Sequence, residues 1–72
     1  MTTVYSYFKA QLGVSPDETS LQELNIDTAC GQACCTVINA ARCYLETADD
    51  HVDVRNPLIE SVNNAVNILW IG

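Results

Sequence analysis

The sequence predicts an all-α protein: one small domain, residues 1–72, built as a bundle of three principal helices with a long central helix. Apolar residues recur at helical spacing in three stretches, and residues typical of helix starts precede them. A chain of 72 residues is too short for two hydrophobic cores, since such chains bury only about 60% of their unfolded surface. At 49% hydrophobic the chain is also too apolar for intrinsic disorder, in spite of its net charge of −6.

Residues 4–12 are predicted to form the first helix, because apolar side chains recur there at near-helical spacing. Thr3 is placed to cap its N-terminus, and Gly13 stands where a glycine commonly ends a helix. The helix carries an aromatic face that includes Tyr5 and Phe8. We expect this face to pack in the core or to contact a protein partner, rather than to hold a cofactor.

The long central helix is predicted over residues 21–46. Two start signals precede it: Ser15-Pro16, with acids directly after, and the S-x-x-E pattern from Ser20 to Glu23. We favour a short turn followed by a helix from Leu21, and a start at Pro16 remains the alternative. The predicted apolar row and the residues that broaden it are Ile26, Cys30, Ala33, Cys34, Val37, Ile38, Ala41, Tyr44 and Leu45. The small residues between 29 and 35 indicate a point where another helix crosses closely.

All four cysteines lie in this predicted helix, at positions 30, 34, 35 and 43. Tetrahedral zinc sites draw their cysteine pairs from turns or from two separate elements, and no second pair is present. Thioredoxin-like redox chemistry uses C-x-x-C at a helix N-terminus after a strand, which this stretch lacks. We therefore interpret the cysteines as reduced core residues, and we predict no metal or other cofactor.

Residues 46–56 lose the helical period and gather acids around a histidine, which predicts a solvated surface loop with a short extended piece at Val52 and Val54. The acids Asp49, Asp50 and Asp53 lack the order of a calcium-binding EF-hand loop. Asn56 as N-cap and Pro57 at the first helical position then predict a third helix over 57–70. Its asparagines, at positions 63, 64 and 67, are expected to face water.

The charge balance argues against a grip on nucleic acid, because only Lys9, Arg42 and Arg55 are basic against nine acids. No apolar run approaches the length of a membrane span and no signal peptide is evident, so we expect a cytoplasmic protein. His51 has no nucleophile or orienting partner at a readable spacing, so we expect no catalytic residues and no enzyme activity.

The last residues are very apolar for a chain end: Leu69, Trp70 and Ile71 follow one another. Such a segment either folds back onto the core or is offered to another protein chain. With Tyr5, Phe8 and the acids Asp49, Asp50 and Asp53, these residues form the set that we predict to contact protein partners.

Three local features of the chain point to a family resemblance. The first is the segment from Phe8 to Val14, FKAQLGV. The second is Asp17-Glu18, with leucines at 21 and 24, before an alanine-rich long helix that ends near Tyr44-Leu45. The third is NPLI, residues 56–59, which opens a final apolar helix ending in Trp70. Together these features resemble the small all-α head-tail connector (portal adaptor) proteins of tailed bacteriophages, and FKAQLGV is similar to the opening motif of that family.

The resemblance implies a structural protein of the virion that forms a homo-oligomeric ring beneath the portal and binds a neck component. The cysteine-rich stretch, the acidic loop and the end directly after Trp70 are departures from the family pattern. The alternative is a small acidic protein of the host cytoplasm that inhibits or regulates a host protein, with Asp49, Asp50 and Asp53 approaching a basic surface.

Overall fold

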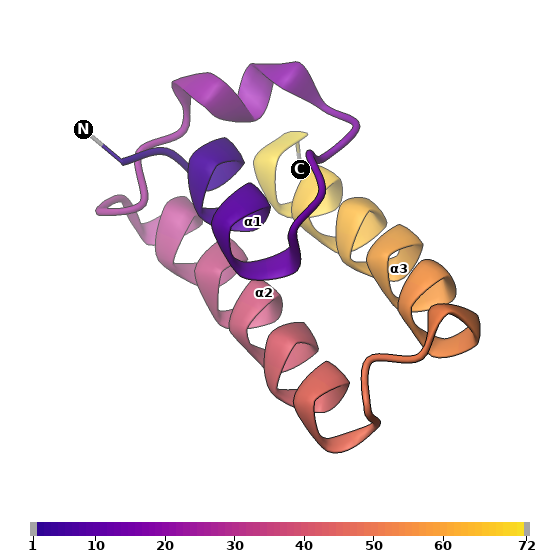
Figure 1. The fold of residues 1–72 in the computed structure, drawn as a ribbon. Helices are drawn as coiled ribbons and strands as arrows, with labels where there is room; N and C mark the ends of the chain where they lie inside the picture. Colours follow the sequence, from indigo (N-terminus) through magenta and orange to yellow (C-terminus); the bar gives the residue numbers. More distant parts are fainter. Residues whose placement is uncertain (1, 72) are drawn as a thin grey trace.

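A computed structural model describes residues 2–71 and has the predicted all-α architecture, a compact bundle of three helices (Figure 1). Its elements, in chain order, are α1 (Val4–Leu12), a short 3-10 helix η1 (Thr19–Glu23), α2 (Ala29–Thr47) and α3 (Val52–Ile71). None of the helices in this described part is long and apolar enough to cross a membrane. The fold class and the number of principal helices are thus as predicted.

Helix α1 has the predicted bounds because both of its local end signals are used. The Thr3 hydroxyl accepts a hydrogen bond from the backbone N–H of Ser6 at 3.3 Å. At the other end, Gly13 adopts a left-handed conformation (φ 77°) and donates its N–H to the carbonyl of Lys9 at 2.9 Å.

Helix α2 begins at Ala29 rather than at Leu21, so the predicted start is wrong by eight residues and the Pro16 alternative is wrong as well. Residues after η1 instead run extended beside the N-terminal segment. The carbonyl of Leu24 accepts from the N–H of Val4 at 2.8 Å, and the N–H of Ile26 donates to the carbonyl of Thr2 at 3.1 Å. These long-range bonds satisfy backbone groups that a helix would otherwise have paired locally.

The true N-cap of α2 is Thr28, whose hydroxyl oxygen accepts from the N–H of Gly31 at 2.9 Å. Gly31 also allows the backbone of Asn25 and Ile26 to lie close to α2. A Cβ atom at this position would lie 2.1 Å from the carbonyl oxygen of Asn25 and 2.8 Å from the Cα of Ile26. The small residue here therefore accommodates the chain's own preceding loop, whereas the sequence suggested a crossing helix.

Helix α3 begins at Val52, five residues before the predicted start at Pro57. Val52 and Val54 are helical rather than extended, and Asn56 lies inside the helix rather than at its cap. The predicted acidic loop shrinks to a tight reversal in which Asp49 and Asp50 both have positive φ, 62° and 47°. Aspartate tolerates this left-handed conformation better than most residues do, which permits the short connection between α2 and α3.

The core lies between the α2–α3 hairpin and a second layer formed by α1 with η1 (Figure 1). Helix α2 packs against both α1 and α3, as expected for a central helix. The fully buried side chains of highest volume are Phe8, Leu12, Leu21, Ile38, Val4, Val66 and Cys34. Helix α2 thus contributes the row of Cys34, Ile38 and Leu45 to the core, while Tyr44 from the same predicted row is 53% exposed.

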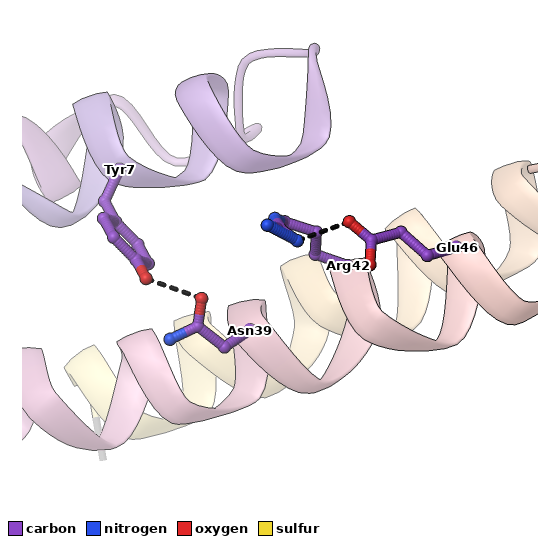
Figure 2. Close-up of polar contacts among 4 residues, drawn as sticks. All are labelled: Tyr7, Asn39, Arg42 and Glu46. Carbon is purple, nitrogen blue, oxygen red and sulfur yellow. Dashed lines mark hydrogen bonds and ion pairs between the residues drawn. The ribbon is translucent and has the colours of Figure 1, made fainter.

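The polar contacts between α1 and α2 lie at the edge of this core. Figure 2 shows the Tyr7 hydroxyl of α1 donating a 2.6 Å hydrogen bond to Oδ1 of Asn39 on α2. Farther along α2, Arg42 and Glu46 form an exposed ion pair at 2.5 Å. Tyr7 thereby joins the two layers, whereas the ion pair stays within one helix.

Candidate protein-binding surface

The predicted interaction residues do not form one site. Phe8 is fully buried and belongs to the core, so its ring has no exposed surface for a partner, and Tyr5 is half-buried against that core. At the C-terminal end of α3, Leu69 is 39% exposed and Ile71 is 75% exposed. The three aspartates are exposed at the α2–α3 connection.

Trp70 folds back onto the chain, which was one of the two predicted alternatives. It packs against the hydrophobic core, and its indole Nε1 donates a 2.7 Å hydrogen bond to the hydroxyl of Ser20 in η1. This contact joins the end of α3 to the second layer. The ring is therefore held by this chain, while its neighbours Leu69 and Ile71 stay accessible.

The acidic connection is partly committed to the fold. The Asp50 carboxylate pairs with Nη1 of Arg55 at 2.6 Å, and a second nitrogen of the same guanidinium donates to the carbonyl oxygen of Leu12 at the end of α1. Asp53 lies in the first turn of α3, where its negative charge interacts favourably with the positive end of the helix dipole. Its Oδ2 is 3.9 Å from Nδ1 of His51, and both side chains are exposed. Of these three aspartates, Asp49 and Asp53 thus remain available to contact another molecule.

A polar recess of about 210 Å³ lies beside this connection and is lined by Gln11, Arg42, Leu45, Glu46, Asp50 and Arg55. It holds two of the three basic residues of the chain, but each is paired with a carboxylate, Arg42 with Glu46 and Arg55 with Asp50. The recess therefore offers no surplus of positive charge to an anionic ligand.

The cysteines are all free thiols, and they do not share one environment. Burial, followed by the neighbouring Cys30 and Cys35, raises the pKa of Cys34 to about 11. Burial also raises the pKa of Cys35. Both thiols therefore stay protonated at neutral pH, which makes them poor nucleophiles and poor metal ligands.

The other two cysteines lie nearer the surface. The Cys30 thiol contacts the carbonyl oxygen of Leu69 on α3 at 3.1 Å, and Cys43 is exposed. In the described residues, 2–71, no three His, Cys, Asp or Glu side chains gather closely enough to hold a metal ion. The predicted core role thus applies to Cys34 and Cys35, while Cys43 was wrongly assigned to the interior.

A groove with an apolar lining lies between α2 and α3. It has a volume of about 320 Å³ and is lined by Val37, Ala40, Ala41, Tyr44, Leu58, Ser61, Val62 and Ala65. None of these eight residues carries a charge. Ala41 and Val62 also belong to the core, so the floor of the groove lies where α2 and α3 pack against each other. The buried row of Cys34 and Ile38 does not line the groove.

Two large side chains at or near the groove are well exposed. Tyr44, one of the lining residues, is 53% exposed, and Ile68, three residues beyond Ala65 on α3, is 70% exposed. A large side chain that is half exposed beside small ones makes a surface of ridges and hollows, which suits protein contacts better than a small polar ligand.

The groove was not predicted from the sequence, because Val37 and Tyr44 were assigned to the core in one apolar row with Ala41, and only Ala41 of the three is buried. The row is in fact two rows, one through Cys34 and Ile38 that is fully buried and one through Val37 and Tyr44 that lines the groove. The sequence did carry a signal for the groove, because the apolar residues of this helix span an arc too wide to be covered by one neighbouring layer.

Comparisons of the chain with protein-family models, with curated proteins and with solved structures find no match.

Proposed function

We propose that this protein is a non-enzymatic assembly protein that works by binding other protein chains through the α2–α3 groove. The observation that carries the proposal is the uncharged apolar lining of that groove on a chain whose net charge is −6. Interface centres are depleted of charged residues, whereas ordinary protein surface is rich in them. A half-exposed tyrosine at the groove is also the kind of side chain that anchors interfaces.

The specific role that we propose is a head-tail connector or neck adaptor of a tailed bacteriophage, assembling as a homo-oligomeric ring on the portal. This assignment rests on the resemblance of the segments 8–14, 17–24 and 56–59 to that family. The small size and all-α architecture agree with it. The protein partners would be the portal and a following neck component, and the location would be the virion.

The test of this role is quantitative mass spectrometry of purified, tail-bearing phage particles from the virus that encodes the chain. We expect the chain to remain with the particles through density-gradient purification, at a copy number comparable to that of the portal subunit, since a closed ring contains a small fixed number of subunits. Its recovery only from the unassembled protein of infected cells would overturn the connector role. The major capsid protein and a non-structural phage protein provide the positive and negative controls.

The second candidate function is inhibition or regulation of a host protein in the host cytoplasm. It is favoured by the exposure of Asp49 in the α2–α3 connection and of Asp53 in the first turn of α3, next to the ion pair of Asp50 with Arg55. Acidic side chains displayed on a fixed turn are suited to approach a basic surface.

Salt dependence separates the two candidates once a partner is in hand. Binding through the acidic connection weakens by at least about 10-fold between 50 and 500 mM salt, because the charges are exposed and screened. Binding through the uncharged groove changes little over that range. The double variant Asp49→Asn, Asp53→Asn should abolish the first kind of binding and leave the second intact.

A further inference from the structure

The α2–α3 face is long enough to support a stable contact between two protein chains. Helices α2 and α3 have 19 and 20 residues, which makes each about 30 Å long. This matches the longest dimension of the molecule, 31 Å. Two adjacent helices, each about 10 Å wide and 30 Å long, have a projected area of about 600 Å². Their accessible surface area is larger than this projected area, because side chains make the surface uneven. A standard interface takes about 800 Å² from each partner.

We propose that this face binds a second copy of the chain, forming an antiparallel four-helix bundle with two-fold symmetry. The two-fold axis lies in the interface and runs perpendicular to the helices, so that α2 packs on α2 of the second copy and α3 packs on its α3. This inference rests on the proposed function, in that it takes the α2–α3 groove as a protein-binding surface. It goes further in naming the occupant of the groove in the free protein.

The outward row of α2 is complementary to itself in this arrangement. Ala33, Val37, Ala40 and Tyr44 follow one another at helical spacing, with a small residue at one end and a large one at the other. A two-fold axis at the middle of the row sets Tyr44 opposite Ala33 of the second copy and Val37 opposite its Ala40. Each large side chain then meets a small one, which is the pairing that close helix packing needs.

The outward row of α3 is complementary in the same way. An axis between Ser61 and Val62 sets Leu58 opposite Ala65 of the second copy, again a large residue against a small one. The axis is the same for both helices. The contact of the Cys30 thiol with the Leu69 carbonyl sets position 30 of α2 level with position 69 of α3. The middle of the α2 row therefore lies within about one residue, or about 1.5 Å, of the α3 axis.

Electrostatics decides between this arrangement and the other two-fold packing of two hairpins. An axis parallel to the helices would bring the connections with Asp49, Asp50 and Asp53 of both copies to the same end of the bundle. The perpendicular axis places them at opposite ends, about 30 Å apart, beyond the reach of screened charge repulsion at physiological salt. A chain of net charge −6 therefore favours the antiparallel bundle.

The first test is the mass of the full chain in reducing buffer, measured by size exclusion with light scattering at about 100 µM, where a Kd of about 1 µM leaves mostly dimer. We expect twice the 7.9 kDa of one chain. Ala40→Glu sets charge in the centre of the interface and should weaken dimerisation by at least about 100-fold, because the charge would be buried without a partner.

The matched control is Ala10→Glu, the same substitution at an exposed alanine of α1, and it should leave the dimer intact. Ala40 is exposed in the single chain, so both variants should keep their helical circular dichroism and remain comparable. A monomeric wild type, a mass above two copies, or equal effects of the two variants would overturn the inference.

The second test reports on the geometry and uses the background variant Cys43→Ser, which removes the exposed thiol. Ser61→Cys sets two thiols beside the axis, and oxidised glutathione should convert them to an intermolecular disulfide while it is reduced to glutathione. Asn64→Cys, also exposed on α3 but away from the axis, should stay unlinked. A dimer in which the two variants cross-link equally would contradict the antiparallel arrangement.

These outcomes are separate from the test of the proposed function. A monomeric chain found in purified particles at a portal-like copy number overturns the dimer and keeps the connector. A dimeric chain absent from particles overturns the connector and keeps the α2–α3 pairing.

Discussion

Asn63 links α3 to the loop after α1 through hydrogen bonds, although the sequence predicted that it lies on the solvent-exposed face of its helix. Its Oδ1 accepts a 2.9 Å hydrogen bond from the N–H of Asp17, and its Nδ2 donates to the carbonyl of Ile59 at 3.2 Å. The side chain is only 6% exposed. Asn67, one turn later, is half-buried with its Oδ1 enclosed, so two of the three predicted surface asparagines face inward. Residue type alone predicts that an asparagine is exposed. Whether it is buried depends on a backbone group, distant in the sequence, that needs a hydrogen-bond partner.

Replacing Asn63 with alanine should therefore destabilise the domain by about 1–3 kcal/mol, because the N–H of Asp17 would lose its buried acceptor. Urea unfolding followed by circular dichroism measures the change. Asn64→Ala, at the exposed neighbouring position, should stay within about 0.5 kcal/mol of the wild type. Equal effects of the two substitutions would show that the hydrogen bond to Asp17 contributes nothing.

The Cys34 thiol makes stability sensitive to alkaline pH. Its pKa is raised to about 11 in the folded chain, first of all by burial, against an ordinary value of 9.0. The unfolded chain therefore loses this proton at lower pH than the folded chain does. The contribution is fully present below about pH 9 and is lost as the pH rises to about 11, by about 1–3 kcal/mol.

Urea unfolding at pH 7, 9 and 11 under reducing conditions measures this loss. Cys34→Ala should show a shallower decline between pH 9 and 11 than the wild type, while Cys43→Ala, at an exposed position, should decline as steeply. Parallel declines in all three proteins would assign the alkaline sensitivity to other groups.

At the scale of the elements, start signals in the sequence compete, and the structure chooses among them by long-range bonding. Ser20 and Glu23 form a capping pattern, yet Ser20 accepts from Trp70 and its N–H donates to the carboxylate of Glu18. The start that is used, Thr28, follows a local turn in which Asn25 Oδ1 accepts from the N–H of Asp27 at 2.8 Å. The short cluster N-I-D-T was a readable signal for this start.

The used and unused caps can be compared directly. Thr28→Ala should cost about 1 kcal/mol of stability, because the N–H of Gly31 loses its acceptor at the start of α2. Asn56→Ala alters the predicted cap, which is an exposed position inside α3, and should change stability by less than about 0.5 kcal/mol. Thermal unfolding of both variants decides the point, and a larger loss for Asn56→Ala would restore the predicted start of α3.

Over the whole molecule, a few polar contacts tie together segments that are far apart in the chain. Arg55 connects the end of α1 with the α2–α3 connection, Trp70 connects the end of α3 with η1, and Tyr7 connects the two layers. Small domains have little buried surface to spare, so such contacts weigh more in them than in larger proteins.

Arg55→Ala should therefore destabilise the domain by about 1–3 kcal/mol, since it removes the donor to Leu12 and the partner of Asp50 from a partly buried position. Arg42→Ala removes an exposed ion pair within one helix and should cost no more than about 0.5 kcal/mol. Chemical unfolding of the two variants checks the difference. A loss for Arg42→Ala as large as that for Arg55→Ala would place the stabilising charge interaction on α2 instead.

The sequence by itself determined the helical class, the bounds of α1 and the two stretches that hold the later helices, because periodicity and caps act within a few residues. Only the tertiary structure decided among the possible starts of α2, since the residues before Ala29 pair with the N-terminal segment, as in the bond from Ile26 to Thr2. It likewise decided that Tyr44 lies at the surface, whereas the burial of Cys34 agrees with the prediction. An apolar row on a helix predicts that another element packs against it. The positions of the other elements determine which row is buried and which is left exposed as the α2–α3 groove.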